Sequence, residues 1–190
     1  MRADARKNYD QLVAVARDVV TQEGADASLR DIARRAGVGL GTMYRHFPTR
    51  ETLLEALLRT SFDELTDKAA ELRSADSASA ALVSWLGDFV ACAHNYRGVI
   101  DLMVAAIEDP GSALHTSCVT MKAAGAELLA RAQAEGTART DIDATDLYAL
   151  GGALAWVGDQ PALAPRVDHL FAIITGAILT TRQSPADLTA

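Results

Sequence analysis

The stretch that decides the fold is Ser28-Leu-Arg-Asp-Ile-Ala-Arg-Arg-Ala-Gly-Val-Gly-Leu-Gly-Thr-Met-Tyr-Arg-His-Phe47. Its apolar residues fall where two short helices joined by a Gly-containing turn would bury them: Ile32, Ala33, Val38, Met43 and Phe47. The small side chain of Ala33 lets two helix backbones cross closely, and Gly37 suits a left-handed turn position. This pattern is typical of a helix-turn-helix, whose second helix enters the major groove of DNA.

The charge of this stretch differs from that of the whole chain, whose formal net charge is −7. Residues 1–60 carry ten Lys and Arg against eight Asp and Glu, whereas residues 61–190 carry eight against seventeen. Between residues 28 and 50, Asp31 alone opposes five arginines, which are Arg30, Arg34, Arg35, Arg45 and Arg50. Because salt screens charges over about 10 Å, the local charge governs contact with a polyanion. We expect a phosphate-facing patch; an ordinary charged helix face is the alternative.

Composition favours a globular, intracellular protein. The 190 residues are 49% hydrophobic and 23% charged, as in average soluble domains. Residues 1–10 are polar, unlike a secretory signal, and the longest apolar stretches (147–158 and 170–180) are shorter than the about 20 residues of a membrane span. Two cysteines, Cys92 and Cys118, fit a reducing compartment. We therefore expect a cytoplasmic protein that makes no membrane contact.

The rest of the chain also has the pattern of helices, because no window alternates with period two. Expected N-caps are Ser28 (with Asp31), Thr49 and Asp143 (with Asp146). The fold class is therefore all-α, with about nine helices. Their predicted spans are 5–23, 28–37, 40–46, 49–72, from the polar connector 74–79 to 98, 99–108, 113–135, from 143 onward, and 165–182.

The sequence resembles the tetracycline-repressor family of bacterial regulators. The resemblance covers residues 5–58 and rests on Arg30-Asp31-Ile32-Ala33, Ala36-Gly37-Val38, Gly41-Thr42-Met43-Tyr44-Arg45-His46-Phe47 and Arg50. Beyond residue 60 it is architectural only. It implies a three-helix DNA-binding domain (1–50) followed by a helical effector-binding and dimerisation domain (51–190). It also implies a homodimer through the last two helices and release of a palindromic operator when a small molecule binds.

The resemblance also implies which residues meet double-stranded DNA. The expected DNA contacts are Arg30, Leu40, Thr42, Tyr44, Arg45, His46 and Arg50. Arg30 and Arg50 would clamp phosphates, and Arg45 would read guanine through two hydrogen bonds. The chain departs from the family pattern at Gly39, where a capping Ser or Thr is common, and at Leu40, where a polar residue is common. The alternative for Tyr44 is that it only packs.

The C-terminal part is expected to bind an effector and a second copy of the chain. The expected effector-binding residues are Trp85, Phe89, Cys92, Met103, Ile107, His115, Cys118 and Met121, which alternatively fill a core. Few Lys or Arg accompany them, so the effector is expected to be small and mostly apolar. The expected dimer contacts are Leu147, Leu150, Gly151, Leu154, Phe171, Ile174 and Ile178. Two recognition helices would then lie about 34–36 Å apart on DNA.

Nothing local in the sequence supports catalysis. The four histidines have no partner at metal-ligand spacing, and the carboxylates Asp141, Asp143 and Asp146 sit where a helix begins. We therefore expect no enzyme activity, no metal and no cofactor. Two alternatives stay open. One is a helical small-molecule-binding protein or enzyme with a vestigial helix-turn-helix, suggested by Gly39 and Leu40. The other is an activator or nucleoid-type binder that uses the same contacts without an effector.

Overall fold

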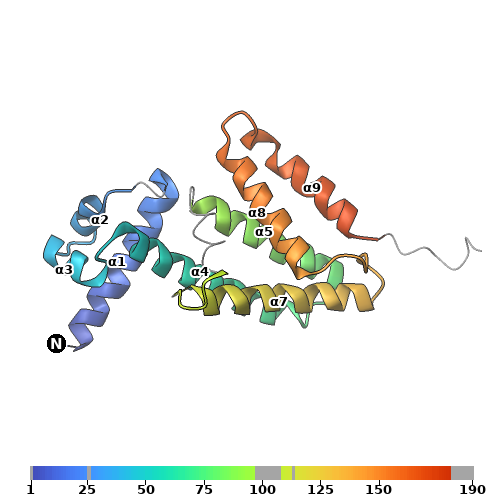
Figure 1. Cartoon of the computed structure of the whole chain (residues 1–190), viewed down its shortest axis with the longest axis horizontal. Helices are drawn as coiled ribbons and strands as arrows, with labels where there is room; N and C mark the ends of the chain where they lie inside the picture. Colours follow the sequence, from blue (N-terminus) through green and yellow to red (C-terminus); the bar gives the residue numbers. More distant parts are fainter. Residues whose placement is uncertain (1, 25–26, 97–107, 113, 181–190) are drawn as a thin grey trace, which may run out of the picture. The chain divides into compact units, whose positions relative to one another are not determined.

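The computed structural model describes residues 2–24, 27–96, 108–112 and 114–180, which are helical apart from their connections (Figure 1). The elements are α1 (Arg2–Glu23), α2 (Leu29–Arg35), α3 (Leu40–His46), α4 (Arg50–Leu72), α5 (Ala78–Asn95), α7 (His115–Ala134), α8 (Ala144–Asp159), the 3-10 turn η1 (Ala164–Arg166) and α9 (Val167–Ile178). The all-α prediction is confirmed. All but the last residue of the helix predicted at 99–108 lies outside the described residues. In the described ranges, no helix has the length and apolar character that a membrane crossing needs.

The chain divides into two compact units. Unit 1 comprises Met1–Asp63 and Cys92–Val119, and unit 2 comprises Glu64–Ala91 and Thr120–Ala190. The core of unit 1 gathers apolar side chains from the first four helices and from Phe47, which follows α3: Leu12, Ala16, Val19, Ile32, Ala33, Met43, Phe47, Leu53, Leu57 and Phe62. Within this core α2 packs against α1, and α3 packs against α2.

The core of unit 2 is built on an aromatic pair. Trp85 and Phe89 are one helical turn apart on α5, and their rings stack with centroids 5.9 Å apart and an interplanar angle of 8°. A Cβ atom added at Gly125 of α7 would lie 2.4 Å from the Trp85 ring, and one at Gly151 of α8 would lie 2.4 Å from the Phe89 ring. Each ring therefore packs on a bare stretch of a neighbouring helix, which explains glycine at both positions.

Long-range hydrogen bonds secure the ends of elements in unit 2. Arg131 of α7 donates to the carbonyls of Leu72, Arg73 and Ala75, and so satisfies the groups exposed where α4 ends. The end of α9 is held by an isolated antiparallel bridge between Ala138 and Leu179. The helix predicted to reach residue 182 therefore ends at Ile178, because Leu179 adopts an extended conformation to make that bridge.

The predicted helix caps have different outcomes. Asp143 accepts hydrogen bonds from the backbone N–H groups of Thr145 and Asp146, and the Asp146 carboxylate accepts from the N–H of Asp143, so that capping box is confirmed. Ser28 occupies the N-cap position of α2 but its hydroxyl makes no cap hydrogen bond, so that prediction is wrong. The Asp31 carboxylate, which would form the reciprocal half of the box, pairs with Arg34 and Arg35 instead.

Candidate nucleic-acid interface

The turn between α2 and α3 is a Schellman motif, a turn that closes the C-terminus of a helix with two backbone hydrogen bonds. The N–H of Val38 donates to the carbonyl of Ala33 at 2.9 Å, and the N–H of Gly37 donates to that of Arg34 at 3.1 Å. Gly37 has φ +65°, a conformation that costs other residues energy. The sequence thus ends α2 at Arg35 and begins α3 at Leu40, which confirms the predicted helix-turn-helix.

Helix α3 begins without a side-chain cap. The carbonyl of Gly39 accepts from the N–H groups of Thr42 and Met43 at 2.8 and 3.0 Å, so the backbone alone starts the helix. Met43 and the following Phe47 are buried and anchor the inner face of α3, as predicted for core residues. Since a helix repeats every 3.6 residues, this anchoring turns Tyr44 and Arg45 outward.

The seven residues expected to contact DNA all belong to unit 1. Arg30, Tyr44 and Arg45 are exposed, whereas the others are half-buried: Leu40, Thr42, His46 and Arg50. Tyr44 is 48% exposed, which argues against the alternative that it only packs. Arg45 is tied to its own helix, because Nη2 donates to Oγ1 of Thr42 at 3.0 Å and Nε donates to the carbonyl of Gly41 at 3.4 Å.

His46 has a packing role that the sequence did not reveal. Its ring meets Tyr9 of α1 edge-on with centroids 5.8 Å apart, and Tyr9 also packs on Phe47 at 5.3 Å. These rings line a surface hollow of about 230 Å³ together with residues of α4: Thr52, Glu55, Ala56 and Arg59. No local signal marks Tyr9, because the contact joins residues far apart in the sequence.

The basic patch is smaller than its five arginines predicted. Arg34 pairs with Asp31, and Arg35 pairs with both Asp31 (2.7 Å) and Glu23 (2.7 Å). A hydrogen bond from Arg34, together with the charges of both arginines, holds the pKa of the Asp31 carboxyl below its ordinary value. Asp31 and Glu23 therefore offset part of the positive charge that Arg34 and Arg35 bring to this patch.

The start of α4 brings Arg50 to the edge of the same region. The N–H of Thr52 donates to Oγ1 of Thr49 at 3.3 Å, and the N–H of Thr49 donates to Oγ1 of Thr52 at 3.2 Å. This reciprocal pair confirms Thr49 as the predicted N-cap and fixes Arg50 in the first turn. Arg50 is half-buried there, and its phosphate contact stays a prediction.

Two family models match the chain. The model described as bacterial regulatory proteins of the tetR family matches residues 12–57, and the model of the SbtR-like transcriptional regulator C-terminal domain matches residues 77–176. The chain belongs to the TetR family. The match at 12–57 spans the whole helix-turn-helix described above, and the other covers more than half of the chain.

Solved structures agree with this assignment. The chain is 33% identical to a TetR transcriptional regulator from Streptomyces coelicolor, with 90% of this chain and 98% of that chain covered and a TM-score of 0.68. A TetR regulatory protein from Mycobacterium vanbaalenii is 32% identical, with 94% and 99% covered and a TM-score of 0.62. Transcriptional regulators of Staphylococcus aureus are 33% identical over 64 residues. That match spans about a third of these curated relatives, 35% of their length.

The residues expected to bind an effector in this TetR-family chain are largely packed. Trp85, Phe89, Cys118 and Met121 are buried, Cys92 and His115 are half-buried, and Met103 and Ile107 lie outside the described residues. The indole Nε1 of Trp85 donates to the carbonyl of Leu65 at 3.0 Å, which fixes the ring. Burial raises the pKa of the Cys118 thiol to about 11, so it stays protonated.

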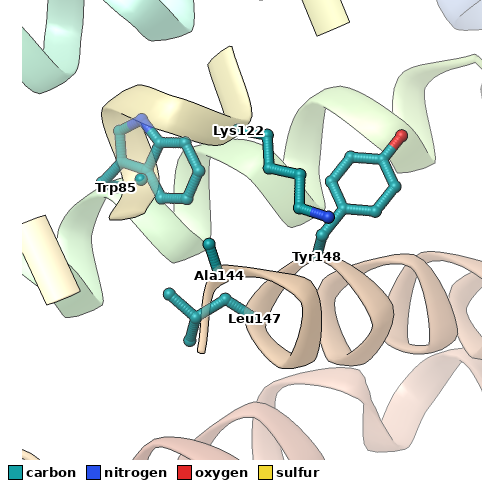
Figure 2. Close-up of a pocket in the computed structure, with 6 residues that line it drawn as sticks. Trp85, Lys122, Ala144, Leu147 and Tyr148 are labelled. Atoms are coloured by element: carbon teal, nitrogen blue, oxygen red, sulfur yellow. The ribbon is translucent and has the colours of Figure 1, made fainter. Parts of the chain in front are cut away.

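The space beside Trp85 within unit 2 is small. Figure 2 shows it between Trp85 on one side and Lys122 with Tyr148 on the other, above Ala144 and Leu147. Its volume is about 10 Å³, roughly the space that is needed to admit one water molecule. Lys122 lines it, donates to Oγ1 of Thr145 at 3.1 Å and lies 5.9 Å from the Tyr148 ring centre. Of the residues expected to bind an effector, Trp85 lines this space, and the assignment of the pocket residues stays a prediction.

Some of the residues expected at the dimer contact are buried in the core of the single chain. Leu147, Gly151, Leu154 and Ile178 are buried, and Leu150, Phe171 and Ile174 are half-buried. Two large side chains missed by sequence reasoning stand out instead: Trp156 of α8 and Ile173 of α9 are each 54% exposed. The small residues Ala153, Ala172, Gly176 and Ala177 are exposed on the same two helices. The signal in the sequence that could have identified Trp156 and Ile173 is their large apolar side chains.

A metal centre has no support in the described part of the chain. There, no three His, Cys, Asp or Glu side chains gather closely enough to hold a metal ion. The carboxylates Asp143 and Asp146 are used by the α8 cap, and Asp141 pairs with Arg139.

Proposed function

We propose that this TetR-family chain is a homodimeric transcriptional repressor that binds a palindromic operator and releases it when a small, mostly apolar molecule binds. The observation that carries the proposal is α3 itself. A Schellman turn and a buried Met43 hold a short helix whose outward face offers Tyr44 and Arg45. Such a helix fits the major groove, with its N-terminal residues toward the base edges.

The proposed contacts divide into two classes. Arg30 precedes the turn and Arg50 opens α4, so these flanking cations would hold phosphates and set the position of the protein on the duplex. Arg45 would read a guanine, because a guanidinium donates two parallel hydrogen bonds to O6 and N7. Tyr44 and His46 would add phosphate contacts, and Leu40 would touch a thymine methyl group.

The proposed partner copy would sit on α8 and α9. Trp156 of α8 and Ile173 of α9 are large exposed apolar side chains, and the small residues Ala153, Ala172, Gly176 and Ala177 are exposed on the same helices. Aromatic side chains carry much of the binding energy of interfaces, and small residues let helices approach closely. We propose these side chains as the contact, joined by the half-buried Leu150, Phe171 and Ile174.

A repressor of this kind works on the chromosome in the cytoplasm and catalyses no reaction.

Release by an effector requires two conformations with different affinities for the molecule, because a ligand shifts an equilibrium only by that difference. A molecule that enters beside Trp85 would have to enlarge the space there, which is about 10 Å³.

The proposal is tested with two substitutions in the protein. Binding of each variant is measured on the operator that in-vitro selection enriches and on a random duplex. We expect Arg45→Ala to lose about 1–3 kcal/mol of preference for the operator over a random duplex. Arg50→Ala should weaken binding to both duplexes alike and lower the slope of log K against log salt by about one unit. The measurement is fluorescence anisotropy over a series of salt concentrations. Equal effects of the two substitutions on operator and random duplex would contradict the assignment of base reading to Arg45 and of phosphate binding to Arg50.

A further inference from the structure

The guanidinium of Arg45 is bound to the opposite end of the helix that carries it. Arg45 lies in the last turn of α3, yet it donates to Oγ1 of Thr42 at 3.0 Å and to the carbonyl of Gly41 at 3.4 Å. Long side chains on a helix lean toward its N-terminus, which makes this reach geometrically natural. The guanidinium therefore lies beside the first turn of α3, the part of a recognition helix that approaches the base edges.

The two donors used in these bonds belong to one edge of the guanidinium. Nε and Nη2 form the side edge, and both of their bonds go to α3 itself. The end edge, formed by Nη1 and Nη2, keeps the parallel pair of N–H groups that matches O6 and N7 of guanine. Arg45 is thus held by one edge and can present the other.

Such a hold matters because arginine has many rotamers. An arginine side chain that moves freely in the unbound protein loses rotamer freedom when it binds DNA. Holding the side chain in its binding orientation beforehand removes part of this entropy cost. Thr42 is half-buried, whereas Arg45 is exposed, so the more fixed residue supplies the anchor for the more mobile one.

We infer that Thr42 is a positioning residue for base reading, whose hydroxyl holds Arg45 in the orientation that recognises guanine. The inference rests on the proposed function, since it assigns a role within operator recognition. It differs from a direct contact between Thr42 and a phosphate, because a phosphate contact would strengthen binding to every sequence alike.

The test compares Thr42→Val with Thr42→Ser in the full chain. Valine keeps the branched shape but has no hydroxyl to accept from Arg45, whereas serine keeps the hydroxyl. Dissociation constants are measured at one salt concentration for the enriched operator and for duplexes that change one base pair at a time. The base pair that Arg45 reads is the one whose discrimination disappears in Arg45→Ala.

We expect Thr42→Val to lose about tenfold discrimination at that base pair. Discrimination at the other base pairs should stay close to that of the parent chain, and Thr42→Ser should restore most of what valine loses. Circular dichroism and thermal melting check that each variant is folded. If valine disturbs α3, Thr42→Ala supplies the same comparison.

Three results would overturn the inference. If Thr42→Val weakens all duplexes equally, Thr42 binds phosphate directly and the proposed function still stands. If a palindrome is enriched but none of its base pairs depends on Arg45, the positioning role is also wrong. If a folded protein enriches no duplex, the proposed function fails and the inference fails with it.

Discussion

At the residue scale, the absence of a side chain at Gly125 makes room for the Trp85 ring in the core of unit 2. The Trp85 ring cannot move aside easily, because its Nε1 is bonded to Leu65 and its face stacks on Phe89. A side chain at Gly125 would overlap this ring, whereas a Cβ at Gly87 would lie 3.5 Å from Phe171, an ordinary van der Waals contact. The two positions therefore make a matched pair, because both lie in helices and only one lacks room.

We expect Gly125→Ala to lower the free energy of unfolding by about 1–3 kcal/mol through overpacking. Gly87→Ala should leave it unchanged or raise it by up to about 1 kcal/mol, because alanine favours a helix over glycine. Urea unfolding followed by circular dichroism measures both. A Gly125→Ala variant as stable as Gly87→Ala would contradict the described position of the Trp85 ring.

At the element scale, the box that starts α8 makes stability depend on pH. Hydrogen bonds from the backbone N–H groups of Asp146 and Thr145 lower the pKa of the Asp143 carboxyl below its ordinary value. A group whose pKa is lowered by folding stabilises the protein above its unfolded pKa, about 3.9, and loses that contribution as the pH falls through the folded value.

Asp143→Ala should therefore melt below the parent chain at pH 7, and the difference in Tm should shrink as the pH falls below about 4. Asp143→Asn serves as the control, because asparagine caps a helix without a charge. The gap in Tm between Asn and Ala should stay constant over the same range. A parent-to-Ala gap that does not change with pH would show that the charge of Asp143 has no part in the cap.

Elements whose signals are local were predictable from the sequence. Gly37 after α2, Thr49 before α4 and Asp143 before α8 each act within a few residues, and the structure confirms all three. The Ser28 box is absent although its pattern is present, and the Asp31 carboxylate pairs with Arg34 and Arg35. The role of Arg131, which donates to carbonyl groups at the end of α4, could not be predicted, since these acceptors lie far away in the sequence.

The candidate site likewise has features that local sequence signals predict and features that depend on tertiary contacts. The outward position of Tyr44 and Arg45 follows from the helical period and a buried Met43, so the sequence predicts it. The neutralisation of Arg35 by Glu23 and the packing of His46 on Tyr9 depend on how α1 meets α2 and α3. Such contacts are set by the tertiary fold, and no spacing rule indicates them.

At the scale of the whole molecule, the proposed dimer predicts a coupling between assembly and DNA binding. We expect Trp156→Arg and Ile173→Asp each to give a monomer, because a charge would be buried without a partner at the contact. Both side chains are exposed in one chain, so folding should be unaffected. Losing the second half-site should lower operator affinity by at least about 100-fold.

The control for this prediction is Val119→Asp, which changes a valine that is 47% exposed on α7. Light scattering at micromolar concentration measures the mass of each variant, and anisotropy measures operator binding. We expect the control to remain a dimer that binds normally. A dimer in all three variants would show that α8 and α9 do not form the contact.

The most direct test of operator recognition by α3 is selection of bound sequences from a random duplex pool with the unmodified chain at physiological salt. We predict enrichment of one palindrome, whose half-sites are spaced by about one helical turn, 34–36 Å, or a multiple of it. Enrichment of no sequence by a folded, dimeric protein would contradict the account, because a recognition helix that reads bases must prefer some duplexes over others.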